Sequence, residues 1–293
     1  MLEPTRAVES GTPPDVDRQG RRLLIVGAIA MVFLVMIGYV VAGAAAAGGP
    51  VGRADAALRA TFDHQDRVVA SLSENPFKNL DFKSNTPDIA TAKTALAAYE
   101  HRLASATALV TTDRAALQRI SLDLHGSILT LPERAAIDRD HRRVDAALAG
   151  LASARDGLAI LEKESAFAAP FLDALAGFLA LGNATDLAGV QAQLPGTGAS
   201  LQMAVDLAKP PAVPAELGPM LTAMQQAVTD LRAMVAAAQA NDQAAFSTAS
   251  AALDADVKAM TGFDQTALDQ ADQLRFQPMI DSYNSQMKIA AGG

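Results

Sequence analysis

The feature that most constrains this chain is a row of apolar residues at seven-residue intervals in its first half. The row is Ile89, Leu96, Leu103, Val110, Leu117, Leu124 and Leu131, and alanine, tyrosine or isoleucine fills most positions three residues further on. Such spacing over several heptads is typical of helices that pack along a coiled-coil-like seam. The sequence therefore predicts an all-α fold with one long helix whose heptad seam is Ile89, Leu96, Leu103, Val110, Leu117 and Leu124.

A second row with the same spacing follows a turn. Its members are Ile137, Val144, Leu151 and Leu158. Thr86 and Pro87 are suited to begin the first helix, Gly126 to end it near His125, and Pro132 to begin the second. We expect a long antiparallel hairpin over 87–165 with arms of about 35 residues each.

The chain after this hairpin contains more helix breakers. The apolar stretch 170–181 is about a dozen residues long, which is too short to span a membrane, and predicts a buried core helix. Asn183 and Thr185 are suited to cap a short helix that ends at Leu194, followed by a break at 195–198. The segment KPPAVP, 209–214, marks the best internal boundary, so we divide the exported chain into a helical bundle, 53–208, and a C-terminal part, 214–293.

The C-terminal part predicts a second hairpin and a final helix. Heptad spacing runs from Leu217 to Ala238, and Asn241-Asp242 is suited to cap a return helix. The return helix carries Phe246, Leu253, Val257 and Met260 as its apolar face. We expect the last helix to have Pro278 near its first turn and this whole part to pack on the same bundle.

A long uncharged segment precedes the helical rows. No charged residue occurs between Arg22 and Arg53, and 23–43 is a continuous apolar run. A spanning helix needs about 20 mostly apolar residues. We expect a single N-terminal transmembrane helix, a signal anchor over 23–47 that contacts the lipid bilayer through 23–43, with a break at Gly48-Gly49-Pro50. The alternative is a cleaved signal peptide, although its apolar region is about 7–15 residues and this run is longer.

Three arginines, Arg18, Arg21 and Arg22, lie immediately before the apolar run. Basic residues next to a span favour the cytoplasmic side. Residues 1–22 are polar and rich in proline and glycine, which predicts a disordered cytoplasmic tail. We therefore expect a single-pass protein of the plasma membrane in a bacterial-type cell envelope, with its N-terminus cytoplasmic and its bulk extracytoplasmic.

Composition excludes several classes of function. The chain has no cysteine and no tryptophan, so it has no disulfide, thiolate nucleophile or cysteine-ligated metal. Its net charge of −8 repels phosphate backbones, so we expect no nucleic-acid partner. The histidines show no metal-ligand spacing; they are His64, His101, His125 and His141.

Acidic neighbours at Asp138/Asp140 and Glu162/Glu164 are expected to be solvated, because residues two apart on a helix point in different directions. No nucleophile or phosphate-binding motif is present. We predict no catalytic residue, no cofactor and no metal site, and hence no enzyme. A hydrolase whose site has no sequence motif is a further alternative.

A long polar stretch, 73–86, carries three isolated apolar residues, Phe77, Leu80 and Phe82. Long loops in compact domains are often functional, so these residues are a candidate interaction loop. The simpler interpretation is that they dock on the bundle and close one end of it.

The combination of an anchor, long hairpins and no recognisable chemistry predicts a non-enzymatic scaffold. It would serve as an interaction protein or accessory subunit beside another membrane or envelope protein. The alternative is a ligand-binding helical sensory module that acts through a membrane partner, with its small-molecule ligand unknown.

Overall fold

The computed structural model describes residues 49–74, 88–125 and 134–292, and this part of the chain is all-helical, with no strand. Residues 49–72 are helical and precede α2. The labelled elements are α2 (Ile89–His125), α3 (Arg134–Gly182), α4 (Leu187–Leu207), the 3₁₀ helix η2 (Ala215–Leu217), α5 (Gly218–Ala240), α6 (Gln243–Thr261) and α7 (Gln265–Ala290).

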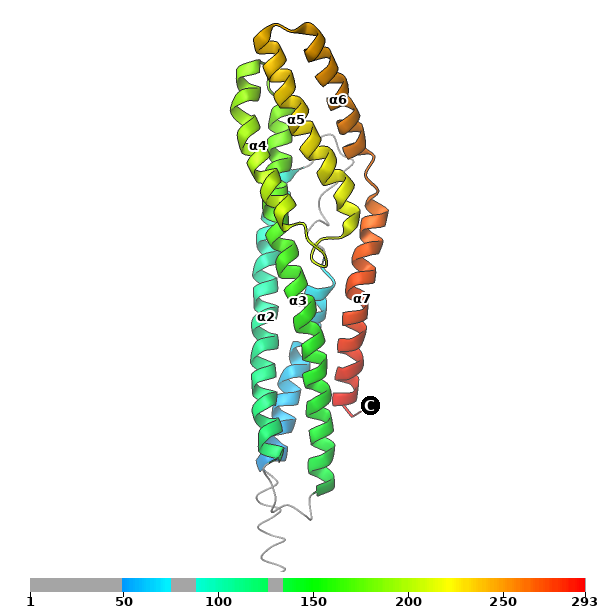
Figure 1. Cartoon of the computed structure of the whole chain (residues 1–293). Coiled ribbons are helices and arrows are strands. Elements are labelled where there is room, and N and C mark those ends of the chain that lie inside the picture. The colour runs from blue at the N-terminus through cyan, green and yellow to red at the C-terminus, as the bar shows by residue number, and fades with distance from the viewer. Residues whose placement is uncertain (1–48, 75–87, 126–133, 293) are drawn as a thin grey trace, which may run out of the picture.

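The helices form one elongated bundle with two unequal parts (Figure 1). We call the four-helix part the shaft; it comprises 49–72, α2, α7 and 134–164 of α3. We call the other part the head; it comprises 165–182 of α3 with α4, α5 and α6. At 1.5 Å per residue, α3 is about 70 Å long and runs through both parts, and the start of α2 reaches the head, where Lys93 pairs with Asp173.

The heptad seam is buried within the single chain. Its six residues are at most 7 % exposed, and the companion row is buried as well. The seam packs mainly against α3, and the two helices run antiparallel. Leu131, Thr86 and Pro87 lie outside the described residues; α2 begins at Ile89, where Asp88 accepts hydrogen bonds from the Thr91 amide and hydroxyl.

The second arm of the hairpin is longer than we expected. α3 continues through Pro170 to Gly182, so the segment 170–181 is not a separate core helix. Proline removes one backbone hydrogen bond. Phe167 and Phe171 on either side of it are completely buried and stacked, with ring centroids 5.2 Å apart, so packing holds the helix together.

The predicted break at 195–198 was also wrong. α4 passes through Pro195 and Gly198 without interruption. Thr197 is buried and lies against Gly177 of α3, where a Cβ atom would come within 2.2 Å of the Thr197 Oγ1. The glycine therefore permits close contact between α3 and α4, which stabilises the helical conformation of this segment.

Aspartates cap three of the later helices. Asp186, rather than Asn183 or Thr185, caps α4, and Asp242 and Asp264 cap α6 and α7. Each accepts hydrogen bonds from backbone amides of the first turn, as N-cap residues do. The last helix thus begins at Gln265, and Pro278 lies in its interior rather than near its first turn.

The predicted membrane segment lies outside the described residues: this holds for the tail 1–22 with its three arginines, the span 23–47 and Gly48. Gly49 and Pro50 are already helical. Among the described helices, α3 alone is long and apolar enough to cross a membrane, with 39 % of its apolar window buried. Its contacts with α2, α4 and α7 and its buried Asp140 and Glu164 are those of the central helix of a bundle.

Candidate functional site

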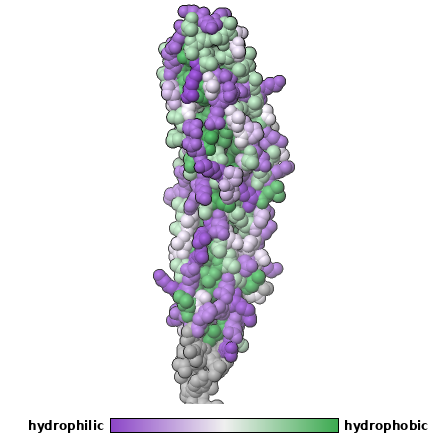
Figure 2. All heavy atoms as spheres, viewed as in Figure 1, coloured by the Kyte–Doolittle hydropathy of each residue, from purple (hydrophilic) through white to green (hydrophobic). Residues whose placement is uncertain are grey.

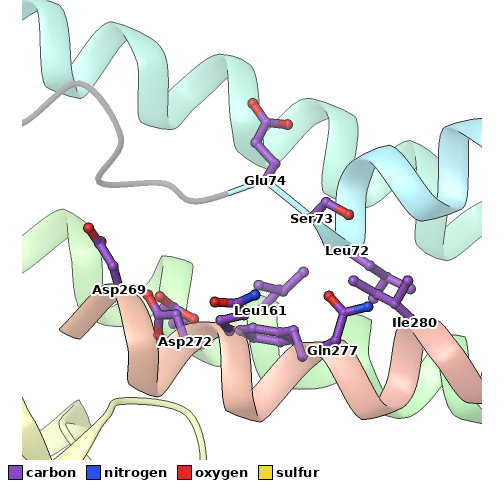
Figure 3. Close-up of a pocket in the computed structure, with 11 residues that line it drawn as sticks. Leu72, Ser73, Glu74, Leu161, Asp269, Asp272, Gln277 and Ile280 are labelled. Atoms are coloured by element: carbon purple, nitrogen blue, oxygen red, sulfur yellow. The ribbon is translucent and has the colours of Figure 1, made fainter. Parts of the chain in front are cut away.

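A cavity of ≈ 260 Å³ opens where the first helical segment ends beside α7, and α3 contributes to its lining (Figure 3). Asp269 and Asp272 lie on α7, and Leu72 to Glu74 lie across from them. The apolar lining residues are Leu72, Leu161, Phe276 and Ile280, and the polar ones are Ser73, Glu74, Glu164, Asp269, Asp272, Gln273 and Gln277.

A buried arginine organises the charges beside the cavity. The Arg275 guanidinium donates to Glu164 Oε2 on α3 at 2.7 Å and to Asp272 Oδ1 at 2.6 Å. It also donates to the carbonyl oxygens of Pro211 and Ala212 and lies 4.6 Å from the centre of the Phe276 ring. Arg275 therefore joins α7, α3 and the α4–α5 connection.

Burial dominates the electrostatics of this cluster. Desolvation raises the pKa of Glu164 to about 8, although Arg275 opposes the shift. Desolvation also raises the pKa of Asp272, again against Arg275, and the neighbouring Asp269 raises it further. Glu164 and Asp272 are both counter-ions of Arg275, and burial raises the pKa of each carboxyl group.

The Tyr99 hydroxyl is buried without a hydrogen-bond partner among the described residues. Its pKa is raised, first by desolvation and then by the negative charges of Glu164 and Glu74. Tyr99 is 2 % exposed. A lone buried hydroxyl beside carboxyl groups is costly unless a further polar group reaches it.

The opening of the cavity carries two more carboxylates. Glu74 is held by Arg102 of α2 in a bidentate ion pair. Asp269 is exposed and makes no ion pair within the described part of the chain. Asp269 and Asp272 are three residues apart on α7 and so share one face of the helix.

Two acidic residues that we expected to be solvated are buried. Glu164 forms an ion pair with Arg275. Asp140 forms ion pairs with Arg139 and Arg143, and Arg143 also pairs with Asp55. The partners are 111 residues apart in the first case and 88 apart in the Arg143–Asp55 pair. No local pattern reports the Glu164–Arg275 and Arg143–Asp55 pairs, whereas Asp140 and Arg143 are three residues apart on one helix and could have been paired from the sequence.

Histidines also come together in ways that spacing did not reveal. His141 Nε2 lies 2.9 Å from the His125 ring nitrogens, and His141 Nδ1 lies 2.8 Å from Asp145 Oδ2. His64 Nδ1 lies 2.9 Å from the buried Asp113 Oδ2. Over the described ranges, no group of three acidic or histidine residues is placed to hold a metal ion.

The residues that we singled out from the sequence do not form the cavity. Phe77, Leu80 and Phe82 lie outside the described residues, as do Arg18, Arg21 and Arg22. The heptad seam is part of the core, and of its companion row only Tyr99 lies near the charges of the cavity.

The head exposes apolar surface. The predicted apolar face of α6 is not buried: Val257 is 45 % exposed, Phe246, Leu253 and Met260 are half-buried, and Ala249 is the one buried residue of the helix. Among the labelled helices α6 contacts α5 alone. Leu187, Met203 and Leu207 of α4 are exposed as well. Figure 2 shows apolar side chains among hydrophilic ones over the upper part of this face.

Comparison of the chain with protein-family models, curated proteins and solved structures finds no match. The geometry itself describes an elongated α-helical bundle with a charged cavity in its shaft and an incompletely covered head.

Proposed function

We propose that this protein is a membrane-anchored, extracytoplasmic helical scaffold, a non-enzymatic accessory subunit that binds another membrane or envelope protein. The anchor is the apolar run 23–43, which precedes residue 49 by only a few residues. Arg18, Arg21 and Arg22 favour a cytoplasmic N-terminus in the plasma membrane. The shaft would then extend outward from the bilayer.

The apolar face of α6, which brings several partly exposed apolar residues together on one helix, carries the proposal; the exposed Leu122, Leu274 and Ile289 of the shaft are isolated residues. Residue 49 lies at the lower end of the shaft, and the head lies at the opposite end (Figure 1). The apolar face of α6 and Leu187 at the start of α4 thus lie toward the end of α3, which is about 70 Å long. Apolar surface that a chain leaves uncovered often marks an interaction site. A rigid shaft with such a head would reach a partner well above the membrane.

Photocrosslinking in cells tests this proposal. A photoreactive amino acid at Val257 in the head should capture one discrete membrane or envelope protein, whereas the same residue at the exposed Gln118 in the shaft should not. Equal adducts from both positions, or none from either, would contradict a binding role for the head.

Cysteine labelling tests the anchor. A cysteine at Ser10 should be shielded from a thiol reagent that does not cross the membrane, and a cysteine at the exposed Ser247 should be labelled.

A ligand-binding sensory module that acts through a membrane partner is the second candidate. One observation favours it, the cavity beside Arg275, because concave sites with an apolar lining and a few polar groups are where small molecules bind.

A further inference from the structure

We propose that the cavity between α7, α3 and Leu72–Glu74 binds a small organic cation, a protonated primary amine with a short hydrocarbon chain. This site goes beyond the scaffold function, since a scaffold needs no ligand. It also names the chemistry that a sensory module of this fold would recognise.

The charge balance of the cavity favours a cation. Arg102 compensates Glu74, and Arg275 compensates Asp272. Asp269 has no cationic partner in the described part of the chain, and its charge acts on Asp272 one turn away. An ammonium group between Asp269 and Asp272 would relieve this repulsion. An anion would meet three carboxylates at the opening.

The buried Tyr99 hydroxyl is a second, independent observation. It has no hydrogen-bond partner among the described residues, and the charges that act on it are those of Glu164, Glu74, Arg275 and Asp272. Glu164, Glu74 and Asp272 line the cavity, and Arg275 binds Glu164 and Asp272.

The apolar lining and the volume define the rest of the ligand. Leu72, Leu161, Phe276 and Ile280 provide a surface for hydrocarbon. The volume of ≈ 260 Å³ is smaller than that of a typical drug-sized site, which starts at about 300 Å³. The described carboxylates form no group of three that would coordinate a metal ion, so the geometry points to an organic cation.

Calorimetric titration of the detergent-solubilised full chain with n-butylamine at neutral pH and fixed salt tests the proposal. n-Butanol and butyrate are matched ligands without the positive charge. We expect saturable binding of butylamine with a Kd of ~1 mM or tighter. Butanol should bind more weakly and butyrate not at all. Absence of saturable butylamine binding, or equal binding of either control ligand, would overturn the proposal.

Variants locate the binding to the cavity. Asp269→Asn should raise the Kd of butylamine about five- to tenfold, because an exposed charge pair contributes on the order of 1 kcal/mol. Asp254→Asn makes the same change of charge on the exposed surface of α6 and should leave the Kd unchanged. Equal Kd values for the two variants would overturn the assignment. Both aspartates are exposed, so each variant should keep the wild-type circular dichroism spectrum.

Loss of butylamine binding would leave the Val257 crosslink unaffected. The ligand proposal and the scaffold proposal can therefore fail separately.

Discussion

The shaft and the head are built from similar alanine-rich helices but differ in how completely they are covered. In the shaft, residues 49–72, α2, α3 and α7 cover one another, and the seam is buried along its whole described length. In the head, α5 is the one labelled helix that α6 contacts, and α6 buries one residue. The same helical periodicity therefore yields a closed core where four helices meet and an open face where they do not.

The two parts also treat buried charge differently. In the shaft, buried carboxyl groups contact basic side chains: Glu164 contacts Arg275, Asp140 contacts Arg143, and Asp113 contacts His64. In the head, Asp230 of α5 and Asp256 of α6 face each other, and each has a buried oxygen without a hydrogen-bond partner in the described chain. Partial burial and the contact with Asp230 raise the pKa of Asp256. In the shaft, basic side chains therefore face the buried carboxyl groups, whereas two carboxyl groups meet at the α5–α6 contact.

The largest expected effect comes from a charge in the seam. Leu117→Asp places a carboxylate at a position with no exposure, and more than about 4 kcal/mol should be lost. Val257→Asp makes the same kind of change on the open face of α6 and should cost less than about 0.5 kcal/mol. Urea unfolding followed by circular dichroism measures both. A wild-type midpoint for Leu117→Asp would mean that the seam is not the core of the shaft.

Close helix contact in the head gives the next largest effect. Gly177→Ala should destabilise the protein by about 3 kcal/mol, because its Cβ would overlap Thr197 on α4. Gly196→Ala, in the same α4 helix, meets no atom within 4 Å and should stabilise by up to about 1 kcal/mol. Thr197→Ala should restore part of the loss in Gly177→Ala. Equal midpoints for the two glycine variants would show that α3 and α4 do not approach closely.

The comparison also shows what the sequence could and could not predict. Local patterns predicted the all-α class, the α2 seam, the end of α2 at His125 and the α5–α6 hairpin, because each depends on residues close together in the chain. Proline and glycine misled us at Pro170 and at 195–198, where packing of Phe167 and Phe171 and the contact of Thr197 with Gly177 outweigh local preference. The cavity was not predictable, since Leu72, Glu164 and Asp272 meet only through the fold.

Stability should fall as the pH rises from 4.5 to about 8, the range between the ordinary and the folded-state pKa of Glu164 in the shaft. The folded-state pKa of Glu164 is about 8, above its ordinary 4.5. Its contribution is therefore complete below pH 4.5 and is lost as the pH rises through 8. Between pH 6 and pH 9 we expect a loss on the order of 2 kcal/mol from this group. The raised pKa values of Asp272 and Asp256 act in the same direction.

Glu164→Gln tests the assignment, because its amide is uncharged at every pH, is similar in size and keeps an oxygen that accepts from Arg275. The urea midpoint of this variant should change less between pH 6 and pH 9 than that of the wild type, with Glu162→Gln, on the exposed side of α3, as the matched control. Identical pH profiles for the three proteins would assign the alkaline loss to other groups.

The smallest effect concerns two matched helix caps, and it separates shaft from head most directly. Asp242 and Asp264 each accept hydrogen bonds from two backbone amides at the start of α6 and α7. Replacing either by alanine removes about 1 kcal/mol of helix stability. Since α6 contacts α5 alone, Asp242→Ala should increase amide hydrogen exchange within α6 and leave α2 unchanged. α7 packs along α3, so the loss in Asp264→Ala should be shared by the shaft and appear as a lower midpoint for global unfolding. Faster exchange confined to α7 in Asp264→Ala, or spread over the whole chain in Asp242→Ala, would show that the two parts do not differ in cooperativity.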